Sequence, residues 1–142
     1  MATRQAHARW EGTLREGKGT VDFAGGHFNA PYSFQSRFGE GAGTNPEELL
    51  GAAHASCFAM ALSLALTEAG LKPRYVDATA HVTIAPKDGG FAITRSHLVC
   101  EADVPGTDNA TFVKHAESAK ANCPVSKALA GTDITLEAKL RA

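Results

Sequence analysis

The sequence lacks a strong charge of either sign. Its 142 residues include 14 lysines and arginines and 15 aspartates and glutamates, which gives a formal net charge of -1. Nucleic acids and anionic membranes attract basic surfaces. We therefore expect neither of them to be the main partner of this protein.

Short motifs that hold metals, phosphates or redox-active dithiols are also missing. The three cysteines, Cys57, Cys100 and Cys123, form no CxxC pair, which argues against a thioredoxin-type site and a zinc ribbon. Neither an HExxH motif nor a glycine-rich phosphate loop occurs. The sequence therefore predicts no cofactor and no metal centre.

The opening residues, MATRQAHARWEG, contain no apolar stretch typical of a signal peptide. A long apolar stretch does occur over 49–69, but it is dominated by alanine and includes His54 and Glu68. A membrane span needs about 20 mainly apolar and bulkier residues. We expect a buried helix there, no membrane partner and a cytoplasmic protein, in which paired cysteines are more often catalytic or metal-binding than structural.

Length and composition suit a single globular domain over residues 1–142. The first third alternates in the manner of strands: 7–14, then 20–23, then 28–34 with Pro31 inside it. We predict a small antiparallel meander. A glycine-rich connection without periodicity follows over 37–43.

A long helix is predicted next. Thr44 or Asn45 is placed to cap it, Pro46 takes the first helical position, and two glutamates fill the first turn. Gly70 supplies the stop signal. Because the helix is apolar on nearly every face, we expect protein to enclose it on most sides.

The second half of the chain continues the alternation of strands and helices. We predict strands over 77–84 and 91–104, joined as a hairpin by the turn signal PKDGG over 86–90. Helices over 109–121 and 124–130 and a last strand over 134–140 follow. The predicted class is α+β, with antiparallel sheets around a long buried central helix.

Cys57 lies in the middle of the predicted central helix. A cysteine in this position can be a small core residue, since free cysteine is among the most buried residue types. Apolar surroundings disfavour a thiolate, and the positive end of the helix dipole is too distant to help. If Cys57 is a nucleophile, a cation must come from elsewhere in the chain.

Glu47 and Arg37 are the candidates for that electrostatic support. Helical periodicity places Glu47 about 80° around the axis from Cys57, while Glu48 falls on the opposite side. A carboxylate near a thiolate helps only if it holds a cation, and Arg37 in the preceding loop is the nearest plausible one. The alternatives are an ordinary first-turn glutamate and a solvated arginine.

Cys123 directly precedes Pro124 and so occupies the capping position of a short helix. Unsatisfied N–H groups at such a position lower the pKa of a thiol. The alternative is a small apolar residue at the end of a loop. Cys100 falls in an alternating strand, where we expect a core residue.

Two motifs carry a resemblance to a known family. TNPEELLGAAHASCFAMAL over 44–62 and NCPVS over 122–126 closely resemble the central helix and the second cysteine motif of the OsmC (osmotically inducible protein C) family. HARWEG, KGTV and GFAIT resemble its opening strands and middle hairpin, so the likeness covers essentially the whole chain. It is nearer to OsmC proper than to the sister group of organic hydroperoxide resistance proteins.

The resemblance implies an OsmC-like fold in an intertwined homodimer and a peroxidase mechanism. By that analogy Cys57 attacks an organic hydroperoxide, or more weakly hydrogen peroxide, and becomes a sulfenic acid. Cys123 then forms a disulfide with it, which a dithiol such as a lipoylated protein reduces. Arg37 corresponds to the arginine that stabilises the thiolate, and Glu47 to the glutamate that positions this arginine.

Other functions fit the same residues. A redox sensor or binding protein would use the cysteine pair without turnover. A metal-binding module would use Cys57, Cys123 and His54 or other histidines, and a structural protein would carry its cysteines incidentally. A peroxidase for alkyl hydroperoxides further requires an apolar pocket, for which the candidates are Phe34, Phe38, Phe58 and Met60.

Overall fold

The computed structural model describes residues 1–141, and the chain divides into two compact units, Met1–Leu49 and Leu50–Ala142. Each unit contains one three-stranded sheet. The prediction of one domain over 1–142 stays a prediction.

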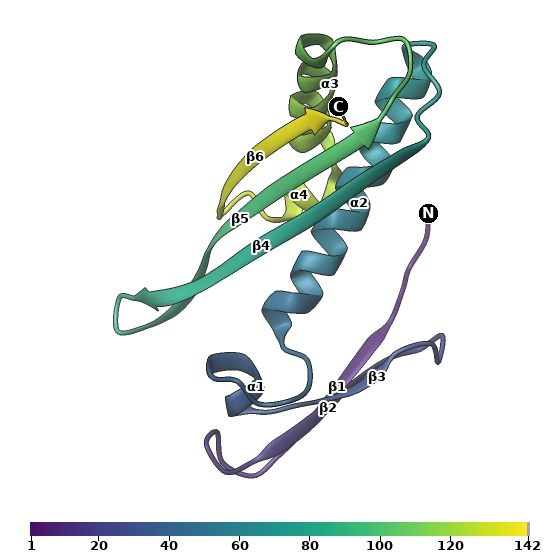
Figure 1. Cartoon of the computed structure of the whole chain (residues 1–142). Helices are drawn as coiled ribbons and strands as arrows, with labels where there is room; N and C mark the ends of the chain where they lie inside the picture. Colours follow the sequence, from purple (N-terminus) through teal and green to yellow (C-terminus); the bar gives the residue numbers. More distant parts are fainter. Residues whose placement is uncertain (142) are drawn as a thin grey trace. The chain divides into compact units, whose positions relative to one another are not determined.

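The first unit contains the predicted antiparallel meander (Figure 1). Its strands are β1 (Ala6–Glu11), β2 (Lys18–Phe23) and β3 (Asn29–Tyr32), paired in the order β1-β2-β3. Trp10 and Tyr32 flank Gly19 in the register, and their ring centroids are 5.3 Å apart. A side chain at Gly19 would collide with both rings, so the strand needs glycine there.

A short helix, α1 (Phe34–Phe38), occupies part of the segment for which the sequence predicted a connection without periodicity. Two serines cap it reciprocally: the Ser36 N–H donates to Ser33 Oγ over 3.1 Å, and the Ser33 N–H donates to Ser36 Oγ over 2.8 Å. Arg37 therefore lies in the last turn of a helix. The expectation that it lies in a loop was wrong.

Helix α2 (Pro46–Glu68) matches the predicted long helix. Of the two candidate caps, Asn45 is the one that acts, because its Oδ1 accepts a hydrogen bond from the Glu48 N–H over 2.8 Å. At the far end Gly70 adopts a φ of 83°, the left-handed conformation that ends helices and that glycine adopts without strain.

The second unit contains a three-stranded sheet in the order β4-β5-β6. Strands β4 (Tyr75–Lys87) and β5 (Gly90–Asp103) form the predicted antiparallel hairpin, with positive φ at Asp88 and Gly89 in its turn. Strand β6 (Asp133–Leu140) pairs parallel to β5, so the prediction of antiparallel sheets does not extend to it. The reason is the connection: α3 (Asn109–Asn122) and α4 (Pro124–Ala128) carry the chain back to the end of the sheet where β5 began.

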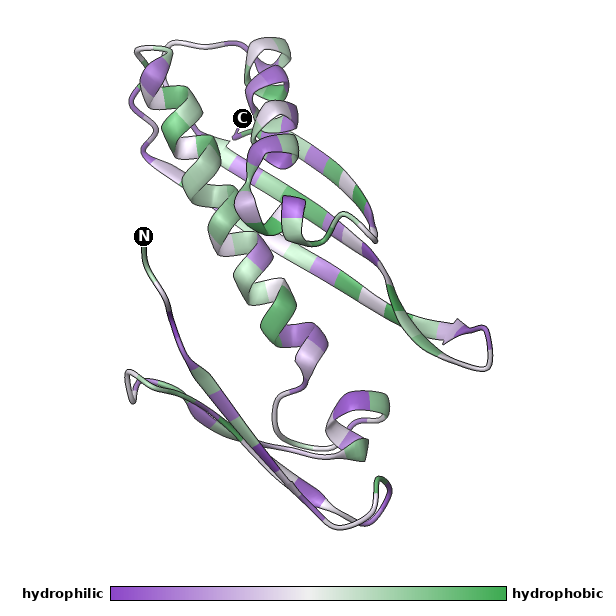
Figure 2. Cartoon of the chain, turned by 180° about the vertical axis from the view of Figure 1, so that it is seen from behind, coloured by the Kyte–Doolittle hydropathy of each residue, from purple (hydrophilic) through white to green (hydrophobic). Residues whose placement is uncertain are grey.

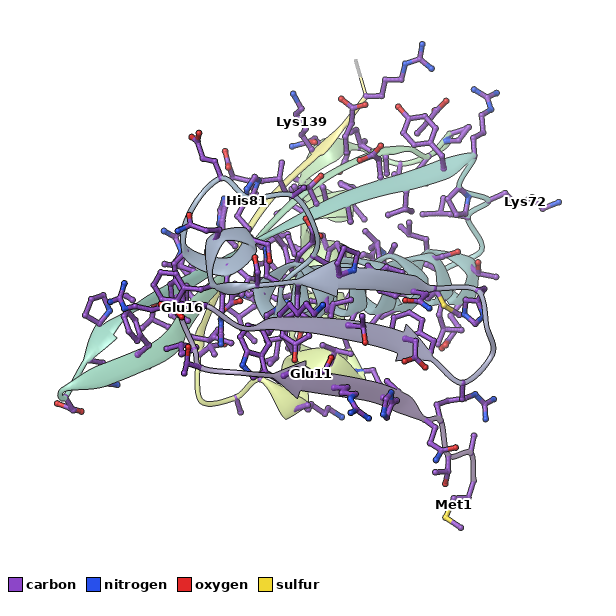
Figure 3. All side chains as sticks on the ribbon, turned by 90° about the horizontal axis from the view of Figure 1, so that it is seen from below. Met1, Glu11, Glu16, Lys72, His81 and Lys139 are labelled. Carbon is purple, nitrogen blue, oxygen red and sulfur yellow. The ribbon has the colours of Figure 1, made fainter. Side chains whose placement is uncertain are left out.

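All three helices of the second unit lie on one face of this sheet (Figures 1 and 2). Exposed residues such as His81 and Lys139 belong to the opposite face (Figure 3). The enclosed core is built from side chains of α2, α3 and β5 and of the residues that directly follow β5 and α3, namely Phe58, Leu62, Leu66, Leu98, Cys100, Ala102, Val104, Phe112, Ala116, Ala119 and Cys123.

Helix α2 contributes to this core along a single stripe. Its buried positions in this unit are spaced three or four residues apart, at Gly51, His54, Phe58, Leu62 and Leu66. The face turned away from the sheet is also hydrophobic (Figure 2). Within the second unit α2 is thus covered less than the sequence predicted.

The apolar face of α2 includes two large exposed side chains, Met60 at 76% and Leu64 at 59% exposure. Among residues 1–141, α2 is the one helix long and apolar enough to cross a membrane, a criterion that the core helix of a soluble protein also meets. That no membrane is involved stays a prediction, supported by the α2 stripe packed in the core.

Cys100 confirms the expectation of a core residue. It lies on β5 with 1% exposure. Burial, followed by the nearby charges of Asp77 and Glu101, raises the pKa of its thiol from 9.0 to about 11. Cys100 therefore stays protonated under conditions in which an ordinary cysteine begins to ionise.

We predict that folding protects Cys100 from alkylation. At pH 9 a thiol with a pKa of about 11 has roughly 50-fold less thiolate than one with a pKa of 9.0, and the thiolate is the reactive form. Iodoacetamide at pH 9 should leave Cys100 unmodified in the folded protein and modify it in urea, as peptide mass spectrometry would show. Equal rates in the two conditions would contradict the burial of this thiol.

Candidate functional site

Arg37 and Glu47, both predicted site residues, form an ion pair in the first unit. The Nη2 atom of Arg37 lies 2.9 Å from Glu47 Oε1, and its Nε donates to Oε1 and Oε2 over 3.0 and 3.2 Å. The Glu47 side chain is 9% exposed and that of Arg37 is 34% exposed. A buried carboxylate is tolerated when a guanidinium satisfies it in this forked manner, and the guanidinium is held in place in return.

Polar contacts around the turn between α1 and α2 fix the position of this pair. Ser36 Oγ donates to the Thr44 carbonyl over 2.7 Å, and Asn45 Nδ2 donates to the Ser36 carbonyl over 2.9 Å. Arg37 follows Ser36 directly, and Glu47 lies in the turn that Asn45 caps. The capping residues of the two helices thereby set the geometry of the ion pair.

A cavity of about 420 Å³ lies beside Arg37 in the same unit. The guanidinium carbon of Arg37 is 5.4 Å from the ring centroid of Phe38, within cation–π range. Two of the four candidate pocket residues, Phe34 and Phe38, line this cavity, and its use as the substrate pocket stays a prediction. Phe58 is instead buried in the core of the second unit, and Met60 is exposed on α2. The cavity lining consists of Trp10, Gly12, Leu14, Tyr32, Ser33, Phe34, Arg37 and Phe38.

Cys57 and Cys123 come together in the second unit, where their side chains share a hydrogen bond. Cys57 is half-buried at the middle of α2, whereas Cys123 is fully buried. Cys123 ends α3 through its N–H, which donates to the Ala119 carbonyl over 2.9 Å. It begins α4 as predicted, its carbonyl accepting from Lys127 over 3.1 Å.

The two thiols have opposite electrostatic surroundings. Burial raises the pKa of Cys57, and the hydrogen bond with Cys123 raises it further against a smaller lowering by the Val125 N–H. Burial also opposes ionisation of Cys123, yet hydrogen bonds from Cys57, Ser126 and Val125 together lower the pKa of its thiol. These hydrogen bonds lower the pKa even though the Cys123 side chain does not form the usual capping hydrogen bond of an N-cap residue. The two sulfurs therefore titrate as a pair that can share one proton.

His54 is a buried polar residue whose role the sequence left open. Its Nδ1 lies 2.7 Å from Ser96 Oγ on β5, and its Nε2 lies 2.8 Å from Ser126 Oγ on α4. Burial lowers the pKa of its imidazole, which favours the neutral ring. The signal in the sequence was its spacing, one helical turn before Cys57 and on the buried stripe.

The metal-binding alternative finds no donor set in the part of the chain that the structure describes. No group of three or more His, Cys, Asp or Glu residues among 1–141 is placed to hold a metal ion. Both ring nitrogens of His54, the histidine considered for such a set, are engaged by serine hydroxyls.

The four predicted site residues thus form two pairs, Arg37 with Glu47 and Cys57 with Cys123. Each pair lies within one unit, and α2 carries one member of each, Glu47 and Cys57.

Comparisons with known proteins identify the family of this chain. The family model described as OsmC-like protein matches residues 39–138. The Peroxiredoxin OsmC of Escherichia coli (strain K12) is 50% identical over 139 residues, covering 97% of this chain and 96% of its own. The Organic hydroperoxide resistance protein of Xanthomonas axonopodis pv. citri (strain 306) is 37% identical over 98 residues, 68% of this chain and 67% of its own.

A solved structure has the same fold. The crystal structure of the Organic Hydroperoxide Resistance Protein OhrB of Bacillus subtilis superposes with a TM-score of 0.76 at 26% identity, over 95% of this chain and 98% of that one. The predicted α+β fold is confirmed by this likeness and by the strands and helices of the two units. By the family model and the identity to its relatives, this chain belongs to the OsmC-like family.

Proposed function

We propose that this protein is a thiol-dependent peroxidase that reduces organic hydroperoxides, and more weakly hydrogen peroxide, in defence against oxidative and osmotic stress. The observation that carries the proposal is the hydrogen-bonded pair of a half-buried Cys57 and a fully buried Cys123. The names of two relatives, peroxiredoxin and organic hydroperoxide resistance protein, support it.

In the proposed cycle the Cys57 thiolate attacks one peroxide oxygen and the O–O bond breaks. The other oxygen takes up a proton and leaves as the alcohol, and Cys57 becomes a sulfenic acid. Cys123 then attacks the Cys57 sulfur and displaces hydroxide, which leaves as water with the thiol proton of Cys123. The exposure of the two cysteines supports this order, because a peroxide meets the half-buried thiol first.

An external dithiol, such as that of a lipoylated protein, completes the cycle by reducing the Cys57–Cys123 disulfide through thiol–disulfide exchange. The chain itself holds no further candidate thiol, since Cys100 lies in the core with its pKa raised to about 11. Three free cysteines in the described structure are compatible with a cytoplasmic location, which we retain as part of the proposal.

Arg37 and Glu47 are proposed to support the Cys57 thiolate. Burial raises the pKa of Cys57 in its own unit, so a reactive thiolate requires a cation. Arginine suits this role because its charge is permanent and its fork can face two acceptors. The ion pair with Glu47 holds the fork in one orientation, and Glu47 and Cys57 share helix α2.

The preference for organic hydroperoxides is supported by the aromatic cavity next to Arg37. An alkyl or aryl group gains free energy when it leaves water for apolar walls, whereas hydrogen peroxide has no apolar part to bury. Phe34 and Phe38 would supply such walls beside the cation.

A homodimer is the remaining part of the proposal. The hydrophobic face of α2, on which Met60 and Leu64 are exposed, is more apolar than water-facing surfaces usually are (Figure 2). A second copy of the chain would bury this face.

The alternative function, a redox sensor with the same cysteine pair, differs from the enzyme only in turnover.

We predict that both cysteines of the pair are needed for turnover, but for different steps. Cys57→Ser should abolish consumption of cumene hydroperoxide with dihydrolipoamide as donor. Cys123→Ser should allow one equivalent to react and then stop, because no disulfide can form. Cys100→Ala is the matched control and should turn over. One equivalent consumed by the unmodified protein despite excess dithiol would favour the sensor, and turnover by Cys57→Ser would refute the mechanism.

Arg37→Ala should slow hydroperoxide reduction by about 100-fold, the usual effect of removing one group that stabilises developing negative charge. It should also raise the pKa of Cys57, so that alkylation of this thiol begins at higher pH. Arg74→Ala, which removes an exposed arginine paired with Asp103, is the control. Identical alkylation profiles for Arg37→Ala and the unmodified protein would remove Arg37 from the site.

Met60→Glu should weaken the dimer, because it places a charge on the hydrophobic face of α2. Light scattering coupled to size exclusion should give the mass of two chains for the unmodified protein and a shift toward one for the variant. His81→Glu, on the exposed face of the sheet, should leave the mass unchanged. A monomeric unmodified protein at micromolar concentration would contradict the proposal.

A further inference from the structure

A series of hydrogen-bonded side chains leads from the interior of the second unit to the Cys123 sulfur. Ser96 on β5 contacts Nδ1 of His54 at 2.7 Å, and Nε2 of His54 contacts Ser126 on α4 at 2.8 Å. The Ser126 hydroxyl in turn hydrogen-bonds the sulfur of Cys123. Ser96 is 1% exposed, Ser126 is 6% exposed and His54 is completely buried. Water therefore has little access to compete for these groups.

The chemistry of a neutral imidazole sets the donor-to-acceptor direction of these hydrogen bonds. One ring nitrogen carries a proton and donates, and the other accepts. The Ser126 hydroxyl favours the Cys123 thiolate, which it can do only by donating its proton toward the sulfur. Its oxygen is then free to accept from His54 Nε2–H, and Nδ1 accepts from the Ser96 hydroxyl. Every donor in this series of hydrogen bonds therefore points toward Cys123.

The same contacts also hold the two cysteines opposite each other. His54 precedes Cys57 by one turn of α2, and Ser126 follows Cys123 by one turn of α4. The His54–Ser126 bond and the Cys57–Cys123 bond therefore cross between the same two helices, about one helical turn apart. Ser96 ties this arrangement to the sheet.

We propose that His54 is a positioning residue for disulfide formation: it fixes the direction of the Ser126 hydroxyl, and that hydroxyl prepares the Cys123 sulfur to attack oxidised Cys57. Ser126 touches the reacting sulfur, and His54 acts through Ser126. The inference rests on the proposed peroxidase function and assigns both residues to its second step. A chemical consequence follows, since a slower Cys123 leaves the Cys57 sulfenic acid exposed to a second peroxide and to sulfinic acid formation.

Single-turnover kinetics test the inference. One equivalent of cumene hydroperoxide is added to reduced protein, and sulfenic acid, disulfide and sulfinic acid at Cys57 are followed by dimedone trapping and mass spectrometry. Ser126→Ala and His54→Leu should lengthen the lifetime of the sulfenic acid about tenfold, the kinetic equivalent of one charge-assisted hydrogen bond. Both variants should accumulate sulfinic acid under excess peroxide.

Conservative variants separate this role from a merely structural one. Ser126→Thr keeps the hydroxyl and His54→Gln keeps a donor and an acceptor, so both should restore rapid disulfide formation. His7→Gln changes an exposed histidine of the meander and is the matched control. A sulfenic acid lifetime in folded Ser126→Ala equal to that of the unmodified protein would overturn the inference. The inference would also be overturned if Ser126→Ala slowed the oxidation of Cys57 and the formation of the disulfide by the same factor. If His54→Leu fails to fold, Ser126→Ala decides the question.

A second measurement separates this inference from the peroxidase proposal because it needs no peroxide. In a Cys57→Ser background, the pH at which Cys123 ionises, followed by the ultraviolet absorbance of the thiolate, should shift to higher pH when Ser126→Ala is added, and should return with Ser126→Thr. No shift overturns the role of the hydrogen-bond chain. If the pH at which Cys123 ionises shifts in this way but the unmodified protein consumes no hydroperoxide, the peroxidase function is refuted and the effect of the hydrogen bonds on Cys123 is supported.

Discussion

The buried stripe of α2 is the packing contact on which the rest of the second unit depends. Phe58, Leu62 and Leu66 are completely buried there against side chains of β5 and α3. The helix has no polar face to orient it, so the complementarity of these side chains and the hydrogen bonds of buried His54 decide which way it is turned. That rotation leaves Cys57 at the edge of the stripe, half-buried and within hydrogen-bonding reach of Cys123.

Polar groups in the interior are tolerated because each has a partner. No buried side-chain nitrogen or oxygen within residues 1–141 is left without a hydrogen bond. Glu47 is matched by Arg37, and His54 by two serines. A buried polar group that loses its partner costs about 1–3 kcal/mol, so these contacts constrain position more sharply than apolar packing does. The residues proposed for chemistry are held by such contacts in both units.

Local signals in the sequence were sufficient for every helix and strand except α1 and suggested the pairing of Arg37 with Glu47, whereas the pairing of Cys57 with Cys123 came from the family resemblance. Asn45, Pro46 and Gly70 mark the ends of α2 because capping depends on neighbouring residues, and the Asp88–Gly89 turn does the same for the hairpin. The resemblance to OsmC then supplied the proposed roles of Cys57, Cys123, Arg37 and Glu47, which periodicity alone left open.

What could not be predicted depends on contacts between distant parts of the chain. The parallel pairing of β6 is set by the direction of the α3–α4 crossover, which no residue in β6 encodes. The role of His54 required Ser96 and Ser126, which are far from it in the sequence. Helix α1 was missed for a local reason, because its capping box uses a second serine where glutamate or glutamine is usual.

The burial of Cys100 has a consequence for which sulfur atoms can bond to one another. Three thiols can pair in three ways, and two of those ways would lock Cys100 into a bridge that removes Cys57 or Cys123 from use. Exchange between such isomers begins with a thiolate, and Cys100 is kept from forming one by its place in the core. The fold thus favours the proposed Cys57–Cys123 disulfide, because it keeps Cys100 from forming either of the other two.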